Sequence, residues 1–450
     1  MSKYILLTGV FLCCCLQVFS ADLPVKIRGY HFSSREGKVR FQKENAALDF
    51  NEYTQKEIEI SEDGFFETIL MAGEPEFWTI EGVSIYIIPG ESLDVVFDNT
   101  TGTYSFKGAT KEECDFLNAN QMHIYVSLSF LDEGKNVRES FEKTKLLVDS
   151  IAAEKLTVLN QTEGLDKNFV NVQKNRIQAH QVNSYLNYYL FTDEGKKYGL
   201  GDEYKTEPGR KFIENIRTLV EPAIRNLVAD ACIDQFDIRW VVDRCRQDSL
   251  AFFPEKSIWT EFYTLRDLLK KFDEGVSSEL IAEAREKLTT LTCNDFVAIL
   301  KPAVAKIEVL ESGKPAIELT LQDMEGKQVN LSDFKGKLIY LDLWATWCGP
   351  CKREFPSFVM LKEKYQDVVF ISVSIDERKA AWLKFMQTKE KTAVLQYHAD
   401  RDLTLDQLIA WNISLIPRFI LIDKDFKIVN SFAPRPSDSE IEPLLNKLLN

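Results

Sequence analysis

The spacing of hydrophobic and polar residues changes twice along the chain of 450 residues. Residues 21–108 contain short runs with strand-like alternation, such as 84–88 and 104–106, and turn residues separate these runs. Asp63-Gly64 is one such turn, because it supplies the positive φ angles that a tight hairpin requires. Several short strands at this spacing predict an antiparallel, β-rich domain, a small sandwich or barrel, over residues 21–108.

Hydrophobic residues in the segment 109–310 recur every three or four positions, which is the period of an α-helix. The clearest stripe consists of Phe212, Ile216, Leu219, Val220, Ala223 and Leu227. The same spacing predicts helices over residues 141–159, 167–191, 258–272, 279–291 and 296–310. We therefore predict an α-helical domain over residues 109–310.

The last part of the chain, residues 311–450, alternates strand-like and helix-like runs after the turn-rich joint 312–315. Apolar runs at 338–343 and 368–375 are typical of central strands. Hairpins are predicted at 317–331 and 418–431, a helix–strand–helix segment at 377–411, and a final helix at 437–449. This order predicts an α/β domain over residues 311–450.

The candidate chemistry lies just after the first central run, where Cys348-Gly349-Pro350-Cys351 is followed by helix-compatible residues. A cysteine at a helix N-terminus has its thiolate stabilised by unpaired N–H groups and the helix dipole. A second cysteine three positions on lies one helical turn away and can form a reversible disulfide with it. We predict Cys348 as the nucleophile and Cys351 as the resolving thiol.

A lone C-x-x-C is also half of a zinc site. Zinc takes three or four Cys or His ligands, usually from a second close pair. The chain has four His, none of them spaced as a pair, and no second C-x-x-C. We therefore expect no metal and no separate cofactor, the redox group being the Cys348–Cys351 disulfide itself.

Composition and charge exclude two classes of partner. The chain is 45% hydrophobic and 28% charged, as in ordinary globular proteins, with a formal net charge of −14. A nucleic-acid-binding protein needs a basic face, and adhesion to an anionic membrane needs basic clusters. Neither partner is expected.

The N-terminus has the form of a signal peptide. Lys3 precedes an apolar run over residues 4–19 that ends in small residues, so we predict a signal peptide over residues 1–20 with cleavage after Ser20. The run is short for a transmembrane helix, which needs about 20 residues. Cys13, Cys14 and Cys15 leave a lipoprotein anchor as the less favoured alternative. The expected location is the periplasm or cell envelope.

An oxidising compartment permits further disulfides among the remaining cysteines. Cys232 and Cys245 lie in a helical-looking region, where they either pair or remain buried thiols. Burial as free thiols is the favoured interpretation, because free cysteine packs as a small hydrophobic residue.

The motif WATWCGPC at residues 344–351 resembles the active site of thioredoxin-fold proteins. The longer stretch from Gly313 to the C-terminus resembles the exported TlpA/ResA-like thiol-disulfide oxidoreductases. The resemblance covers about the last 140 residues, and it implies a thioredoxin fold in which 377–411 is an insertion that plain thioredoxin lacks. The residues before 109 resemble the β-rich module often found ahead of such domains.

The resemblance implies further site residues. Ile416-Pro417 matches the cis-proline that lies against the disulfide, with the Ile416 backbone pairing with substrate; an ordinary trans-proline is the alternative. Asp342 matches a buried acid that takes the proton of Cys351, the alternative being an acid that faces solvent on an edge strand. Ser372 stands where thioredoxin has a lysine beside that acid. Trp347, Gly349 and Pro350 are expected to contact substrate, although Trp347 could simply be core.

The predicted function is an exported thiol-disulfide oxidoreductase that reduces disulfides in client proteins. A reductase in an oxidising compartment must be recharged, so a membrane-embedded thiol electron donor is implied. Residues 21–310 would recruit clients or form a homodimer. Two alternatives remain: a thiol peroxidase, although Thr346 stands two residues before Cys348 rather than three, and a non-catalytic redox sensor or binding protein.

Overall fold

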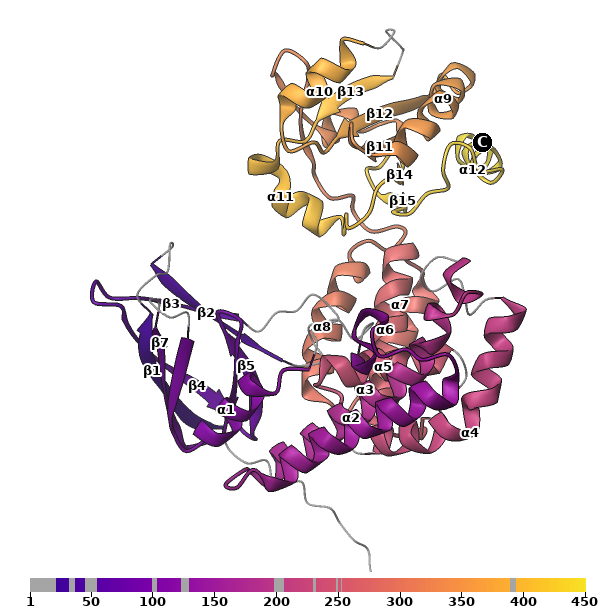
Figure 1. The fold of residues 1–450 in the computed structure, drawn as a ribbon. Helices are drawn as coiled ribbons and strands as arrows, with labels where there is room; N and C mark the ends of the chain where they lie inside the picture. The colour runs from indigo at the N-terminus through magenta and orange to yellow at the C-terminus, as the bar shows by residue number, and fades with distance from the viewer. Residues whose placement is uncertain are drawn as a thin grey trace, which may run out of the picture. The chain divides into compact units, whose positions relative to one another are not determined.

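The computed structural model describes residues 22–31, 37–44, 55–98, 103–122, 129–197, 206–229, 232–247, 250–251, 253–388 and 394–450 (Figure 1). The chain forms two compact units, Met1–Pro254 and Glu255–Asn450. The division falls inside the segment 109–310, for which the sequence predicts one helical domain. The predicted signal peptide and the three cysteines within it lie outside the described residues. Within the described part, no helix has the length and apolar character needed to cross a membrane.

The first unit begins with the β-rich domain. Its strands are β1 (Leu23–His31), β2 (Lys38–Lys43), β3 (Gln55–Glu59), β4 (Phe65–Ala72), β5 (Glu76–Ile80), β6 (Val83–Ile87), β7 (Ser92–Asp98) and β8 (Thr103–Gly108). They form two four-stranded sheets in the orders β4-β1-β7-β8 and β3-β2-β5-β6. Inward-facing residues of both sheets, among them Val25, Phe41 and Ile85, share one hydrophobic core, as in a sandwich.

The expectation of a purely antiparallel domain is wrong in one pairing. Strands β1 and β7 run parallel, with Ile27 opposite Leu93 and Gly29 opposite Val95. Parallel neighbours need a long crossover connection. The chain between them supplies it, because β2, β3, β5 and β6 form the other sheet before β7 returns beside β1.

The rest of the first unit is helical, as predicted. Its helices are α1 (Lys111–Ala119), α2 (Phe141–Gln161), α3 (Lys167–Asn187), α4 (Glu207–Ala229) and α5 (Phe236–Gln247), with a short 3₁₀ helix at Ser129–Gly134. Side-chain oxygens of Ser140 and Asp166 cap α2 and α3 by accepting from N–H groups of their first turns. Helix α3 contacts α2, α4 and α5, so several of its polar residues, among them His180 and Asn183, are buried.

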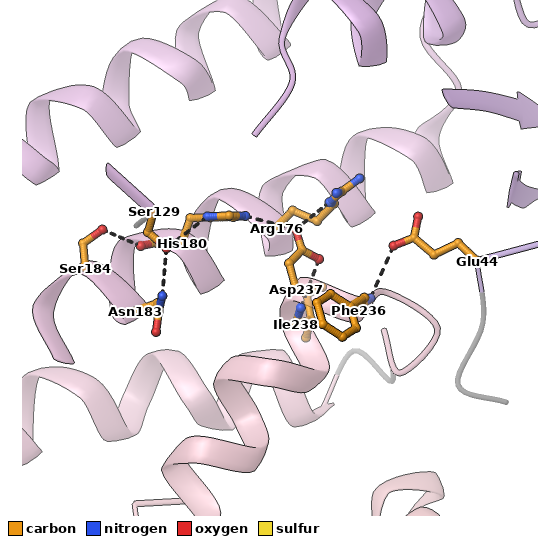
Figure 2. Close-up of polar contacts among 9 residues, drawn as sticks. All are labelled: Glu44, Ser129, Arg176, His180, Asn183, Ser184, Phe236, Asp237 and Ile238. Atoms are coloured by element: carbon orange, nitrogen blue, oxygen red, sulfur yellow. Dashed lines mark hydrogen bonds and ion pairs between the residues drawn. The ribbon is translucent and has the colours of Figure 1, made fainter. Parts of the chain in front are cut away.

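A network of buried polar groups joins α3 to its neighbours (Figure 2). Arg176 Nε donates to Asp237 Oδ2 at 2.8 Å, and His180 Nε2 lies 3.2 Å from the same oxygen. The other ring nitrogen of His180 lies 3.2 Å from Ser129 Oγ, which also accepts from Asn183 Nδ2 at 2.9 Å. The network thus ties α3 to α5 and to the 3₁₀ helix.

The charge of Asp237 belongs to this network. Burial alone would raise the pKa of Asp237, but the positive charge of Arg176 and the hydrogen bonds from His180 and Arg176 outweigh burial and hold that pKa below its ordinary range. The carboxylate therefore remains ionised although the residue is only 5% exposed.

The second unit combines three helices with the C-terminal α/β domain. The helices are α6 (Ile258–Glu274), α7 (Ser278–Thr290) and α8 (Asn294–Glu308). The sheet has the order β10-β9-β13-β12-β11-β14-β15. Its strands are β9 (Thr320–Gln322), β10 (Gln328–Asn330), β11 (Leu338–Trp344), β12 (Val368–Ser374), β13 (Leu395–His398), β14 (Arg418–Ile422) and β15 (Ile428–Asn430). The domain's helices are α9 (Gly349–Lys364), α10 (Lys379–Met386), α11 (Arg401–Ala410) and α12 (Ile441–Leu449).

Helices cover both faces of this sheet. Phe358 of α9 and Leu445 of α12 pack with Tyr340 on one face, whereas Leu408 of α11 packs with Leu341 on the other. Strand β11 is therefore buried along its whole length, which agrees with its continuous apolar run. The predicted helix–strand–helix segment and both predicted hairpins are present as α10-β13-α11, β9–β10 and β14–β15.

We expect Asp237→Asn to destabilise the protein by about 3 kcal/mol at pH 7, because it leaves the buried charge of Arg176 without its partner. A lowered pKa stabilises the fold above the unfolded-state pKa of about 3.9, and this stabilisation is lost as the pH falls through the folded-state pKa. The difference from wild type should therefore shrink below about pH 4. Urea unfolding followed by circular dichroism measures it.

The matched control is Asp115→Asn, which removes an exposed ion pair with Lys111. Such exposed pairs contribute little to stability, because solvent screens them. Equal losses in the two variants would contradict the role assigned to the buried network.

Candidate active site

The Cys348–Cys351 pair lies where β11 ends and α9 begins, as the sequence predicts. Cys348 is the N-cap of this 16-residue helix, and the backbone N–H of Cys351 donates to Cys348 Sγ at 3.1 Å. The two sulfurs form a disulfide with Cα atoms 5.3 Å apart, and each cysteine is 4% exposed. The helix N-terminus favours a thiolate at this sulfur after reduction.

The loop before Cys348 is held by an acid that the sequence analysis missed. Asp376, just after β12, accepts from the Thr346 backbone N–H at 2.9 Å and from its hydroxyl at 2.7 Å. Ser374 Oγ donates to the same carboxylate at 2.7 Å. The sequence does carry a signal for Asp376, which directly follows an apolar run typical of a central strand. Parallel strands end at the same edge of the sheet, so an acid at the end of such a strand lies near the end of β11.

Ile416 and Pro417 lie beside the disulfide. Their peptide bond is cis, so the alternative of an ordinary trans-proline is wrong. The carbonyl oxygen of Ile416 is 3.9 Å from Cys348 Sγ, and its side chain packs against the disulfide. Pro417 directly precedes β14, which pairs antiparallel with β11. Arg418 is opposite Leu343 near the end of β11, so Pro417 lies at the end of β11 that leads to the thiols.

The three remaining predicted contact residues surround Cys348. Trp347 is 68% exposed, so the alternative that it is a core residue is wrong. Gly349 and Pro350 form the first turn of α9, where the missing N–H of proline costs no helical hydrogen bond. A cavity of about 560 Å³ is lined by Thr346 and Trp347 together with apolar residues of α11 and the turn after it.

Asp342 lies on β11 with its side chain buried, 5% exposed. The alternative of an edge strand is wrong, because β11 lies between β12 and β14. Burial raises the pKa of Asp342 to about 7, the negative charge of Glu354 adds to the increase, and a hydrogen bond from Ser372 opposes it. Ser372 is opposite Asp342 on β12, the position that the resemblance predicts, and the structure adds that its hydroxyl donates to Asp342 Oδ2 at 3.0 Å.

A second cavity, of about 810 Å³, is lined by Cys351 of the thiol pair. Its wall includes Asp342 and Trp344 of β11 and Cys351 of α9, with residues from α10 and β13 completing it. Asp342 and Cys351 thus face one space, which is the arrangement that proton exchange between them requires.

The other described cysteines lie outside the site. Cys114, Cys232, Cys245 and Cys293 are not in disulfides, so Cys232 and Cys245 do not pair with each other. The favoured interpretation of buried thiols is confirmed for Cys245, which is buried, whereas Cys232 is only half-buried.

Comparison with known proteins identifies the family. The Redoxin family model matches residues 311–448. The thiol-disulfide oxidoreductase ResA of Bacillus cereus is 32% identical over 146 residues, which cover 32% of this chain and 82% of that protein. ResA of Bacillus subtilis is 32% identical over 161 residues, covering 35% of this chain and 88% of that protein. The chain belongs to the TlpA/ResA-like thiol-disulfide oxidoreductases.

A crystal structure of a proposed thiol-disulfide oxidoreductase from Bacteroides vulgatus is 49% identical, covering 31% of this chain and 98% of that chain, with a TM-score of 0.29. The predicted thioredoxin fold of the C-terminal domain and the predicted class of enzyme, an oxidoreductase of thiols and disulfides, are confirmed by the family match.

We expect Asp342→Asn to stabilise the oxidised protein at pH 7 by roughly 2–4 kcal/mol. The pKa of this carboxyl rises from 3.8 to about 7 on folding. The folded state is therefore most stable at a pH below the unfolded-state pKa, and its stability falls as the pH rises toward the folded-state pKa. The gain of the Asn variant should therefore be absent below about pH 4 and grow up to about pH 7.

Urea unfolding across this pH range measures the gain. Asp367→Asn, at an exposed position before β12, serves as control and should change stability by less than about 0.5 kcal/mol. A pH-independent gain in the Asp342 variant would contradict the assignment of a raised pKa.

Proposed function

We propose that this protein is exported and reduces disulfides in client proteins through the Cys348/Cys351 dithiol. The observation that carries the proposal is the disulfide at the N-terminus of α9, with the carbonyl oxygen of Ile416 3.9 Å from Cys348 Sγ and with Asp342 and Cys351 lining one cavity. Gly349-Pro350, the dipeptide of thioredoxin, favours the reducing end of the range of potentials.

The reaction has two steps. The Cys348 thiolate attacks a client disulfide, forming a mixed disulfide and releasing one client thiolate. Cys351 then transfers its proton to Asp342 and attacks Cys348 Sγ, which releases the second client thiolate and leaves the protein oxidised. Two electrons pass to the client, and a membrane-embedded thiol donor restores the dithiol.

The surface around Cys348 suits an extended, partly apolar client segment. Trp347 is exposed beside the cavity that Leu405 and Ile409 of α11 also line. Pro417 has no N–H to compete for hydrogen bonds, so the Ile416 backbone is left for the client chain. Clients with an apolar residue near the reactive cysteine would gain the most from this surface.

The thiol peroxidase alternative gains no support from the site. The Thr346 hydroxyl is committed to Asp376. The guanidinium of Arg418, next to Pro417, donates to the carbonyl oxygens of Asn412 and Ser431 and lies over the ring of Phe432. The Arg418 guanidinium is therefore committed to these contacts. Peroxide turnover faster than disulfide reduction would reverse the ranking.

The proposed setting follows from the sequence. Removal of residues 1–20 would place the mature protein in the periplasm or cell envelope, with lipidation of a cysteine in that segment as the alternative. Residues 21–310 would recruit clients or join two copies of the chain.

Cysteine variants test the chemistry. Cys348→Ser should abolish reduction of insulin by the purified protein with dithiothreitol as donor, because no nucleophile remains. Cys351→Ser should accumulate mixed disulfides with clients in the cell envelope, because the resolving thiol is missing. Non-reducing electrophoresis followed by mass spectrometry identifies the trapped clients.

The control for trapping is Cys114→Ser, which removes a buried thiol of the β-rich domain, and it should trap nothing. A wild-type protein that fails to reduce insulin with any thiol donor would favour the redox-sensor alternative.

Fractionation of cells that produce the full chain tests export. We expect the mature protein in the periplasmic or envelope fraction, beginning at Ala21, because the signal segment is removed during export. Leu7→Arg, which interrupts the apolar run, should retain the chain inside the cell. An intact chain beginning at Met1 in the cytoplasmic fraction would contradict export, and a lipidated N-terminal cysteine would support the anchored alternative.

A further inference from the structure

The helices α6–α8 are hydrogen-bonded to the thioredoxin domain at both of their ends. At the end of α6, Asp273 Oδ1 accepts from Ser414 Oγ at 2.7 Å, three residues before the cis-proline. Just after α8, the carbonyl oxygen of Leu310 accepts from Ser431 Oγ at 3.0 Å. Val276, between α6 and α7, packs against the same core of the sheet as Ile413 and Ile416. These helices therefore contact the loop that carries the cis-proline.

Arg418, the residue after the cis-proline, connects the two hydrogen-bonded points. It is 4% exposed, and its guanidinium donates to the carbonyl oxygen of Asn412 at 3.0 Å and to that of Ser431 at 3.2 Å. Burial lowers the pKa of Arg418 to about 10, and the negative charge of Asp273 opposes this effect. Because a buried cation is costly without an opposite charge, Asp273 stabilises the ionised arginine in addition to accepting from Ser414.

The loop held in this way, residues 412–416, carries backbone that faces the disulfide. The carbonyl oxygen of Ile416 lies 3.9 Å from Cys348 Sγ. Leu415, directly before it, is 65% exposed, so packing of its own side chain does little to fix the loop. The position of the Ile416 backbone therefore depends on the contacts of Ser414 and Arg418.

We propose that Asp273 is a positioning residue for client binding: from the end of α6 it holds the loop 412–416, so that the Ile416 backbone is in place to pair with an extended client chain. The inference rests on the proposed reduction of client disulfides at Cys348. It gives a role to α6–α8, which lie before the residues 311–448 that the Redoxin family model matches.

The position of Asp273 decides which step it affects. The sulfurs are held by β11 and α9, which Asp273 does not support, so the thiol chemistry itself should be unchanged. A small disulfide reagent needs only the Cys348 thiolate. A protein client that binds as an extended chain also needs main-chain hydrogen bonds, and these depend on where the Ile416 backbone lies.

The test compares Asp273→Ala, Ser414→Ala and the double variant in the full-length protein. Initial rates of insulin reduction, with dithiothreitol as donor, are measured over a range of insulin concentrations. We expect KM to rise about threefold to tenfold in each single variant, the factor that one hydrogen bond contributes, with kcat within about twofold of wild type. The reduced variants should react with dithiobis(nitrobenzoate) at the wild-type rate, because this small disulfide needs no main-chain pairing.

Three comparisons separate positioning from general structural damage. The double variant should bind insulin no more weakly than Asp273→Ala, because the two residues act through one contact. Asp273→Asn keeps an oxygen that accepts from Ser414, so it should recover part of the affinity. Glu274→Gln removes a neighbouring charge that pairs with Lys270 of the same helix, and it should match wild type.

Each outcome supports or overturns the inference. A wild-type KM in Asp273→Ala, a further rise of KM in the double variant, or equal losses with insulin and dithiobis(nitrobenzoate) would overturn the positioning role and leave the proposed function intact. Absence of insulin reduction by the wild-type protein would overturn the proposed function itself, whatever the variants do.

Discussion

The active site depends on one constraint, the fixed position of β11 between β12 and β14. This strand carries Asp342 and leads directly into the loop that ends at Cys348. Its parallel pairing with β12 places Ser372 beside the carboxyl of Asp342. Its antiparallel pairing with β14 brings Pro417 to the end of β11 that leads to Cys348. Backbone hydrogen bonds of a central strand are a rigid support, so the two sulfurs, Asp342 and Pro417 are held close together.

Two buried acids of this chain show how environment decides the use of a carboxyl. Asp237 and Asp342 are each 5% exposed. Asp237 is paired with Arg176 and His180, which keep it ionised and make it a structural link between helices. Asp342 receives only the hydrogen bond of Ser372 against burial and the charge of Glu354, so it exchanges its proton near neutral pH. A buried carboxyl that is paired with a cation stays ionised and stabilises the fold. A buried carboxyl without a cation has a raised pKa and titrates near neutral pH, where it can exchange a proton in a reaction.

Much of the site could be predicted from the sequence because it is encoded in short motifs. Cys348 and Cys351, Asp342 six positions earlier, and Ile416-Pro417 before a strand are all local signals. Residues that act through long-range pairing could not be found this way. Asp376 holds the active-site loop only because β12 ends beside β11, and the parallel pairing of β1 with β7 depends on strands far apart in sequence.

The segment 377–411 completes the surroundings of Asp342 in a way that the sequence does not reveal. Its strand β13 pairs with β12, which places Gln396 in register with Ser372, one strand further from the acid. The inserted segment supplies both that strand and α10, whose Leu383, Phe385 and Met386 wall the cavity. Where thioredoxin has a lysine next to its acid, this chain has a neutral hydroxyl and, one strand further, a neutral amide. A cation in that row would hold Asp342 ionised and weaken it as a base, whereas neutral groups leave its affinity for a proton high.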